Sequence, residues 1–234
     1  MPPTAKFADL VNLKFNRPEI LEQAFIHRSY LNEHRELTLE HNERLEFLGD
    51  AVLELIVTDY LFLQYPHKTE GDLTSLRAAL VNAVTLSEVA GKLGMNDYLY
   101  LSKGEAKDIG RARQVILANT FEAVVGAIYL DLGYEAARKF IAKHLFNKTA
   151  EIVSKNLWQD AKSLFQEKAQ EQLGVTPNYK VLRELGPDHN KRFTIGLFAG
   201  EEQIATGEGH SKQEAEQKAA SRGLTAKGWI NGNQ

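Results

Sequence analysis

The sequence predicts an all-α domain followed by a smaller α+β domain. Apolar residues recur with helical spacing up to about residue 155, and no alternating strand pattern interrupts them. The last third instead shows a helix, three short segments rich in β-branched and aromatic residues, and a second helix, which is an α-β-β-β-α order. This change of pattern predicts a boundary near residues 153–160, with domains at 1–154 and 160–230.

Local signals place the helices of the first domain. Pro18 suits a first helical turn, and Pro66 stops the helix before it. Thr69 is an expected N-cap with Asp72 three residues on, and Gly133 closes a later helix. The expected helices cover residues 17–30, 43–65, 69–94, 115–133 and 134–154, with a polar, glycine-interrupted loop at 101–114.

Similar capping and terminating residues mark the helix ends of the second domain. An amphipathic helix over 160–174 ends at Gly174, and a final helix over 211–228 begins with Ser211 as its N-cap. The strands between them are expected at 178–185, 192–200 and 202–210.

Composition narrows the class of protein. The chain has 234 residues, 43% of them hydrophobic and 25% charged, so it can bury a core. It has no cysteine, which excludes disulfides and thiolate metal sites and fits a reducing compartment. We see no signal peptide and no apolar run near the ~18–20 residues of a membrane span, so we expect a cytoplasmic protein without a membrane partner. The net charge of −3 alone argues against a nucleic-acid binder.

The segment "HNERLEFLGDAVLEL" (41–55) carries a row of acids within a largely apolar helix. Glu43, Glu46, Asp50 and Glu54 fall within an arc of roughly 80° at 100° per residue. Such acids repel each other and raise one another's pKa. Three interpretations remain open for this helix alone: a solvated face, ion pairs with neighbouring helices, or a Mg²⁺ site.

A second helix adds to the third interpretation. In "ILANTFEAVVGA", Asn119 and Glu122 are three residues apart and share a face of another apolar helix. A polar pair in a core helix indicates a partner or a ligand. Oxygen ligands from two facing helices are suited to a metal ion that assists phosphoryl transfer.

These segments carry a resemblance to a known family. "NERLEFLGDA" closely resembles the signature of the ribonuclease III family of double-stranded-RNA endonucleases. "AFIHRSY", "EGDLTSLRAALVN" and "ILANTFEAVVGAIYLDLG" are similar to other segments of its nuclease domain, in the family's order. "GEGHSKQEAEQKAA" resembles part of a double-stranded-RNA-binding domain. The resemblance covers nearly the whole chain and implies an all-α nuclease domain followed by such a binding domain.

The resemblance implies roles for individual residues. Glu46, Asp50, Asn119 and Glu122 would hold Mg²⁺, with Mn²⁺ as a substitute. Asp50 and Glu122 would be catalytic, together with Glu43, which positions the site, and Glu70 of the "EGD" turn. From the residues alone, Glu70 is an acid in a helix first turn, a favourable place for it. Glu54 lies outside the family's metal set, and we interpret it as paired or solvated.

Asn119 departs from the family pattern, which has an aspartate there. Asparagine offers a neutral carbonyl oxygen in place of a carboxylate. Two interpretations follow: an active enzyme that tolerates Asn119, which we favour, or a double-stranded-RNA-binding protein whose cleavage is impaired by it. A third interpretation, a helical di-metal carboxylate protein, is disfavoured because the core helices lack a Glu-x-x-His pair.

By resemblance, the reaction is phosphodiester hydrolysis that leaves 5′-phosphate and 3′-hydroxyl ends, in the processing of ribosomal or messenger RNA. Each nuclease domain in the family cuts one strand, so we expect a homodimer. The resemblance suggests that Phe47 inserts into the partner subunit. From the sequence alone, an ordinary core phenylalanine is equally acceptable.

The RNA-binding residues also come from the resemblance. Gln166 and Glu167 would contact one minor groove, and His189, in the loop "GPDHNKR", would contact the next. The last helix would point its N-terminus at phosphates, with Ser211, Lys212 and Lys218. Residues 160–234 hold ten Lys and Arg and ten Asp and Glu, so we expect weak, salt-sensitive binding.

Overall fold

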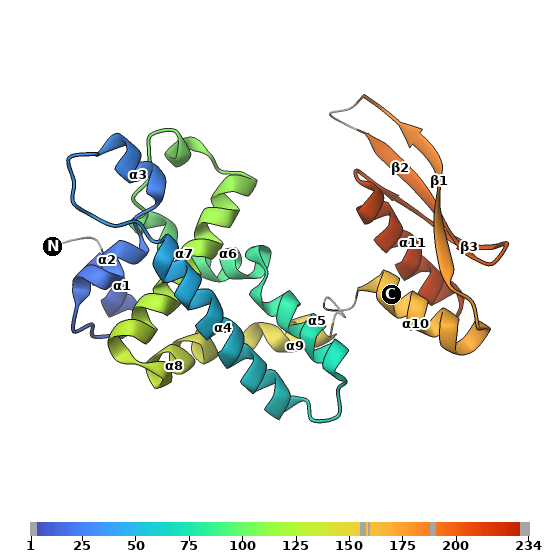
Figure 1. Cartoon of the computed structure of the whole chain (residues 1–234), viewed down its shortest axis with the longest axis horizontal. Helices are drawn as coiled ribbons and strands as arrows, with labels where there is room; N and C mark the ends of the chain where they lie inside the picture. The colour runs from blue at the N-terminus through green and yellow to red at the C-terminus, as the bar shows by residue number, and fades with distance from the viewer. Residues whose placement is uncertain (1–3, 155–157, 159, 188–190, 230–234) are drawn as a thin grey trace. The chain divides into compact units, whose positions relative to one another are not determined.

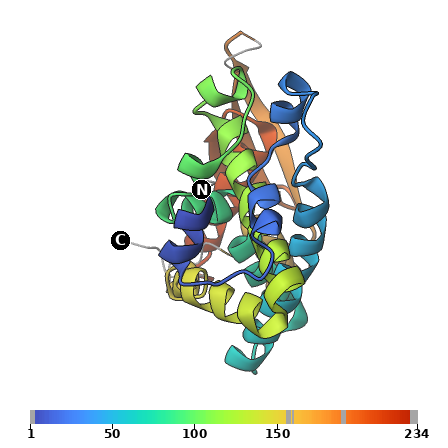
Figure 2. The same cartoon turned by 90° about the vertical axis from the view of Figure 1, so that its left-hand side faces the viewer.

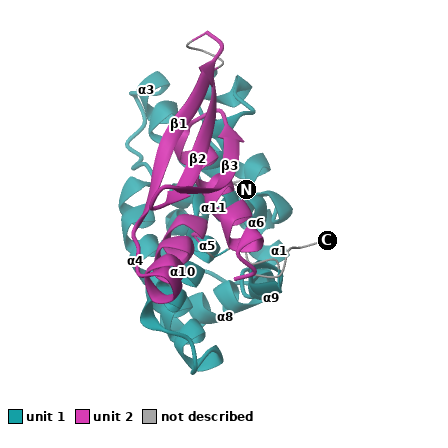
Figure 3. Cartoon of the chain, turned by 90° about the vertical axis from the view of Figure 1, so that its right-hand side faces the viewer, with its two compact units in different colours: residues 1–158 teal, residues 159–234 magenta. Residues whose placement is uncertain are grey.

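The computed structural model describes residues 4–154, 158, 160–187 and 191–229. The chain forms two compact units, residues 1–158 and 159–234, coloured separately in Figure 3. Unit 1 is helical and unit 2 has the order helix, three strands, helix (Figure 1), which confirms the predicted fold class. His189 lies outside the described residues.

Unit 1 is built from helices of very different length. They are α1 (Thr4–Val11), α2 (Pro18–Ala24), α3 (Arg28–Glu33), α4 (Glu43–Gln64), α5 (Glu70–Val81), α6 (Ala83–Lys92), α7 (Arg111–Leu132), α8 (Tyr134–His144) and α9 (Asn147–Ser154), with short 3₁₀ helices η1 (Met95–Tyr98) and η2 (Glu105–Lys107). The predicted capping box of α5 is confirmed: the Asp72 N–H donates to Thr69 Oγ1 at 3.2 Å, and the Thr69 N–H donates to Asp72 Oδ2 at 3.4 Å. Gly133 follows the last turn of α7, as predicted.

Three segments predicted as single helices are each divided in two. The break between α2 and α3 falls where Ile26 pairs with Tyr100 in an isolated bridge. Asn82 separates α5 from α6, because its backbone is extended (ψ 158°) and its side chain accepts the Thr85 N–H at 2.9 Å. The third break, between α8 and α9, lies at the fully buried Leu145.

The start of α7 also differs from the prediction. The helix begins at Arg111, inside the segment predicted as a loop. The Arg113 side chain ties this first turn to the preceding segment, donating to the backbone oxygens of Asp108 (3.1 Å) and Glu105 (2.7 Å). These contacts with the preceding loop stabilise a first helical turn that the glycine-interrupted sequence does not indicate.

Helix α7 is the central helix of unit 1. It packs against α2, α4, α6 and α8, and Figures 1 and 2 show it in yellow-green alongside α4 in blue. Among the helices of the described chain, α7 is long and apolar enough by composition alone to cross a bilayer, but 61% of that apolar window is buried within the protein. Most of its apolar side chains therefore belong to the protein core.

Unit 2 has its own core. Helices α10 (Ala161–Leu173) and α11 (Lys212–Ala226) flank an antiparallel sheet in the order β1 (Pro177–Leu185), β2 (Arg192–Ala199) and β3 (Glu202–Gly209). The buried side chains of Phe165 on α10, Leu197 on β2 and Leu224 on α11 belong to one cluster, so both helices cover the same face of the sheet. Asp160 and Ser211 cap the two helices, and Gly174 ends α10 with a positive φ of 67°.

Candidate active site

Two glycines bring α4 and α7 into direct backbone contact. A Cβ atom added to Gly49 on α4 would lie far inside contact distance of the Glu122 carbonyl oxygen on α7. A Cβ added to Gly126 on α7 would clash in the same way with the carbonyl oxygen of Leu45 on α4. Because neither glycine has a side chain, polar residues on the facing turns come close together.

Carboxylates gather at this crossing. Burial, followed by the negative charges of Asp50, Glu46 and Glu54, raises the pKa of Glu122 to about 8. Burial and the charges of Glu43 and Asp50 likewise raise the pKa of Glu46, while a hydrogen bond from the Asn119 side chain opposes this rise. The structure therefore brings the acidic row of α4 together with Asn119 and Glu122 of α7.

Most acids at the crossing have no cation beside them. In the part of unit 1 that the structure describes, Glu43 alone of this group forms an ion pair, with Arg28 at 3.8 Å, and the imidazole of His41 lies 3.7 Å from its other oxygen. Asp50 and Glu54 are exposed, which agrees with the solvated interpretation for these two side chains. Glu46 and Glu122 are partly buried without a cationic partner in the described chain, so pairing with neighbouring helices does not explain them.

The donor set fits a hard divalent cation in its chemistry. Glu46, Asp50 and Glu122 offer carboxylate oxygens, and Asn119 offers an amide oxygen, all of which Mg²⁺ accepts. A cation there would also remove the repulsion that raises the pKa of Glu122. Nevertheless, no three His, Cys, Asp or Glu side chains among the described residues already converge closely enough to hold a metal ion. Binding therefore requires these side chains to turn towards a common point.

Glu70 lies apart from this cluster within a single chain. It occupies the first turn of α5, where Oε1 accepts a hydrogen bond from Thr74 Oγ1 at 3.0 Å. It lines a cavity of about 430 Å³ together with Lys68, Phe62 and Arg77. The charge of Glu70 does not contribute to the raised pKa values of Glu46 and Glu122. Its expected catalytic role stays a prediction.

Phe47 projects from the acidic helix into solvent. It is 82% exposed, so the interpretation as a core phenylalanine is wrong. A cavity of about 550 Å³ lies beside it, lined by Gln23, Glu43 and Leu130 among others. One exposed apolar side chain is common on protein surfaces, whereas several side by side mark a contact surface.

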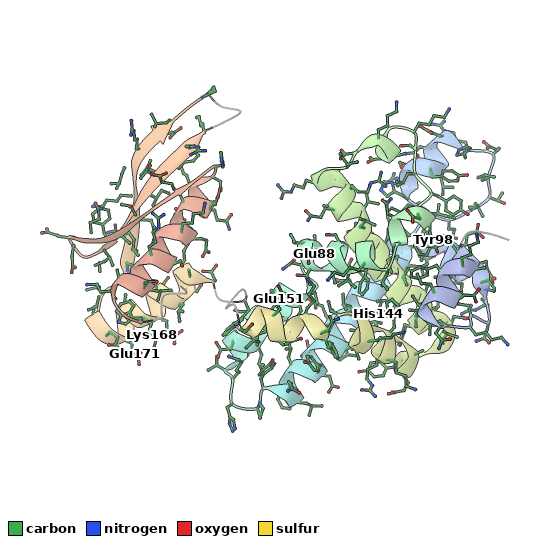
Figure 4. All side chains as sticks on the ribbon, turned by 180° about the vertical axis from the view of Figure 1, so that it is seen from behind. Glu88, Tyr98, His144, Glu151, Lys168 and Glu171 are labelled. Carbon is green, nitrogen blue, oxygen red and sulfur yellow. The ribbon has the colours of Figure 1, made fainter. Side chains whose placement is uncertain are left out.

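The expected RNA-binding residues of unit 2 are exposed on its two helices. Gln166 and Glu167 lie on α10, and Lys212 and Lys218 lie on α11. Ser211 caps α11 by accepting the Glu214 N–H at 3.1 Å. Further along α10, Lys168 and Glu171 form an ion pair of 2.8 Å, and both are labelled in Figure 4.

Sequence reasoning missed the residues that set the geometry of the cluster. Gly49 and Gly126 are glycines inside helices, an unusual position that indicates close packing, but the sequence does not identify the surface they face. Arg28 and His41 were not predicted to contact Glu43. Glu54 was set aside, yet its charge contributes to the raised pKa of Glu122.

Family models match both units. Residues 17–149 match the ribonuclease-III-like family, and residues 161–226 match the double-stranded RNA binding motif. Curated relatives extend over most of the chain. Ribonuclease 3 of Carboxydothermus hydrogenoformans is 48% identical over 215 residues, covering 92% of each chain. Ribonuclease 3 of Geobacillus kaustophilus is 45% identical over 223 residues, covering 94% of this chain and 90% of the relative.

Solved structures of ribonuclease III nuclease domains resemble this chain over about three fifths of its length. One structure of the nuclease domain of ribonuclease III from Campylobacter jejuni is 35% identical, with a TM-score of 0.56, covering 63% of this chain and 96% of that one. A second structure of that domain is 36% identical, with a TM-score of 0.55, covering 61% of this chain and 95% of that one. The latter is described as showing structural flexibility in a region involved in dimer formation.

The two domain matches define an endoribonuclease that carries a double-stranded-RNA-binding domain. The relatives share this arrangement over more than nine tenths of this chain. The chain belongs to the ribonuclease III family.

Proposed function

We propose that this protein is a Mg²⁺-dependent, homodimeric endonuclease that hydrolyses double-stranded RNA and leaves 5′-phosphate and 3′-hydroxyl ends. We further propose that it acts in the cytoplasm on precursors of ribosomal or messenger RNA. The observation that carries the metal-dependent chemistry is the uncompensated carboxylate group at the α4–α7 crossing, where the pKa of Glu122 is raised to about 8.

Each residue of the cluster has a distinct part in this proposal. Glu46, Asp50 and Glu122 would hold the ion, and the Asn119 amide oxygen would complete the set. Mg²⁺ supplies Lewis acidity that activates water and stabilises charge on the leaving oxygen. Glu122 must release its proton before it can serve as an anionic ligand. Arg28 and His41 hold Glu43 at the edge of the cluster.

Cleavage of a labelled RNA duplex tests this proposal. The duplex has about 40 base pairs, enough for more than one binding domain of this type. We expect short products in Mg²⁺ and none in Ca²⁺, with ends that ligate only if they carry 5′-phosphate. Replacing Glu122 by Gln should reduce cleavage by about 100-fold or more. Glu135→Gln is the matched control, since Glu135 pairs with Arg138 on α8 at 3.2 Å.

Asn119 makes a binding-only protein the second candidate. Its side chain hydrogen-bonds to Glu46 where a carboxylate would repel it. Intact RNA in Mg²⁺ and Mn²⁺, with a shifted band on a native gel, would favour this candidate. Asn119→Asp should then restore cleavage. If the unaltered protein already cleaves, Asn119 is a tolerated ligand.

Exposed apolar residues along α4 support the proposed homodimer. Phe47, Leu55 and Phe62 are 82%, 58% and 67% exposed. At 100° per residue they share an arc of roughly 80° beside the acidic row. An isologous contact suits such a stripe, because a two-fold axis pairs the same surface of both copies.

An antiparallel pairing of two α4 helices about Leu55 would place Phe47 of one copy opposite Leu63 of the other. Phe62, next to Leu63, lines the cavity of about 430 Å³ that also contains Glu70. That cavity could therefore receive Phe47, and Glu70 of the second copy would approach the acidic row. This arrangement is consistent with the separation of Glu70 from the cluster in one chain.

The dimer is tested by Phe47→Ala. We expect light scattering after gel filtration to show two chains for the unaltered protein and one for the variant. The control is Ile109→Ala, because Ile109 is 93% exposed but lies on the loop before α7. A variant at Phe47 that stays dimeric would exclude this stripe as the contact surface.

A further inference from the structure

One carboxylate takes up two hydrogen-bond donors at the start of α11. Glu214 Oε2 accepts the backbone N–H of His210 at 2.8 Å, and Oε1 accepts from Lys218 Nζ at 2.7 Å. The hydrogen bond from Lys218 and the one from His210 hold the pKa of Glu214 below its usual range. Glu214 is therefore an anion held against a cation and a backbone amide at a helix N-terminus.

The glycines of β3 hold this helix end close to the sheet. A Cβ atom on Gly209 would meet Glu214 Cβ at 2.8 Å and the Ala215 nitrogen at 2.7 Å. A Cβ on Gly207 would clash with the Ala215 carbonyl oxygen. The first turn of α11 therefore lies directly on β3, and Ser211 caps it through the Glu214 N–H. The position of the Glu214 backbone is fixed by these contacts.

Lys212 differs from Lys218 in having no carboxylate beside its ammonium group in the described part of unit 2. Its ammonium lies 5.8 Å from the centre of the Phe193 ring, and it forms no ion pair in the described part of unit 2. Lys218 is 52% exposed at its side chain, so solvent and phosphates can reach it, but its ammonium is engaged by Glu214. Before RNA binds, Lys218 is therefore already paired with an anion, whereas Lys212 is not.

We propose that Glu214 competes with RNA phosphates for Lys218 and thereby sets the affinity of the binding domain for double-stranded RNA. This inference rests on the RNA-binding function of unit 2. A phosphate contacts this surface through ammonium groups and helix N-terminal amides, the same kinds of donor that Glu214 already occupies. Lys218 must leave Glu214 to contact a phosphate fully, or share its charge between two anions. Lys212 contacts phosphate without such a loss.

Removing the competing charge is the direct test. Glu214→Gln keeps a side-chain oxygen for the His210 N–H but releases Lys218. We expect the full-length variant to bind duplex RNA about 3–10-fold more tightly, in EDTA to prevent cleavage, with a log–log salt slope steeper by about one unit. The matched control is Glu202→Gln, which releases Lys227 (3.2 Å) beyond the C-terminal end of α11 and should leave affinity nearly unchanged.

Two lysine variants test the same idea without altering Glu214. Lys212→Met should weaken binding by about 5–10-fold, whereas Lys218→Met should weaken it less than about 2-fold. In the Glu214→Gln background, the loss caused by Lys218→Met should approach that of Lys212→Met.

Equal losses for both lysines in the unaltered protein, or equal gains for Glu214→Gln and Glu202→Gln, would overturn the proposal. Failure of the unaltered protein to bind duplex RNA would instead refute the binding function itself. Comparing the melting temperatures of all variants separates a folding defect from a binding effect.

Discussion

In unit 1, Glu122 lies partly buried among the charges of Asp50, Glu46 and Glu54, and its pKa rises to about 8. In unit 2, Glu214 contacts Lys218 and a backbone N–H, and its pKa falls. Carboxylates of unit 2 also pair with Lys162, Lys168 and Lys227. Both units therefore carry many acids, but Glu46, Asp50 and Glu122 at the α4–α7 crossing have no cationic partner among the described residues, whereas Glu43 has Arg28. The crossing is therefore where a cation, if bound, would relieve repulsion between acids, and this supports the proposed metal site.

The largest expected effect comes from the packing that creates the cluster. Gly49→Ala places a methyl group against the backbone of α7 at Glu122. We expect a loss of about 3 kcal/mol in the free energy of unfolding, because two packed helices must separate. Cleavage should also disappear, while binding of duplex RNA by unit 2 persists.

Gly91→Ala is the control for this variant, because a Cβ on Gly91, in α6, meets no atom within 4 Å. It should be neutral or stabilising by about 0.5–1 kcal/mol. Thermal unfolding and a cleavage assay on both variants check the pair. Equal stability of Gly49→Ala and Gly91→Ala would contradict the close helix contact.

A smaller effect is expected for Glu122→Gln, which should increase the free energy of unfolding at pH 8 although it removes a native side chain. The raised pKa means that the folded protein binds a proton more tightly than the unfolded chain. Without metal, stability should therefore fall as the pH rises from about 5 to about 8. The Gln variant lacks this dependence and should be more stable at pH 8 by about 1–2 kcal/mol, a figure reduced for solvent screening.

Chemical denaturation in EDTA at pH 5.5 and pH 8 measures this difference. Glu135→Gln, which breaks a surface ion pair, serves as the control and should follow the unaltered protein. Added Mg²⁺ should stabilise the unaltered protein more than the Glu122 variant at pH 8. Parallel pH profiles for the two proteins would contradict the raised pKa.

The smallest expected change in stability is in unit 2, where loss of a carboxylate should destabilise the fold, unlike loss of Glu122 in unit 1. Glu216 contacts Lys162 at 2.5 Å, which joins α11 to α10. Glu216→Gln leaves the partly buried Lys162 without its anion and should destabilise unit 2 by about 0.5–1 kcal/mol. Denaturation at pH 7 in low and high salt checks this value. A stabilising effect of Glu216→Gln would remove the contrast between the two units.

Local sequence signals predicted much of the fold. The Thr69 capping box, Gly133 after α7, Gly174 after α10 and the Ser211 cap all act within a few residues of the helix ends that they define. The divisions at Ile26, Asn82 and Leu145 were missed. Ile26 pairs with the distant Tyr100, which periodicity does not reveal, and Leu145 is buried in a core assembled from several helices. Asn82 shows the limit of local signals, since it suits a cap but stands within a continuous apolar pattern.

The candidate site was predictable in composition but not in geometry. Helical spacing places the acids of α4 on one face of that helix, and it places Asn119 and Glu122 on one face of α7. Spacing alone cannot show that Gly49 and Gly126 allow the backbones of the two helices to touch. The exposure of Phe47 likewise depends on which helices cover α4. The roles assigned to the metal-binding and RNA-binding residues stay predictions until the variants are measured.

The central position of α7 has a consequence for the synthesis of the chain. By length and composition alone this helix is apolar enough to span a bilayer, so its apolar surface must be covered by the rest of the fold. Three of its packing partners, α2, α4 and α6, precede it in the sequence, and only α8 of the four follows it. When α7 leaves the ribosome, most of the surface that will cover it has already been made. The order of the helices in the chain thus shortens the time for which this long apolar segment is exposed during synthesis.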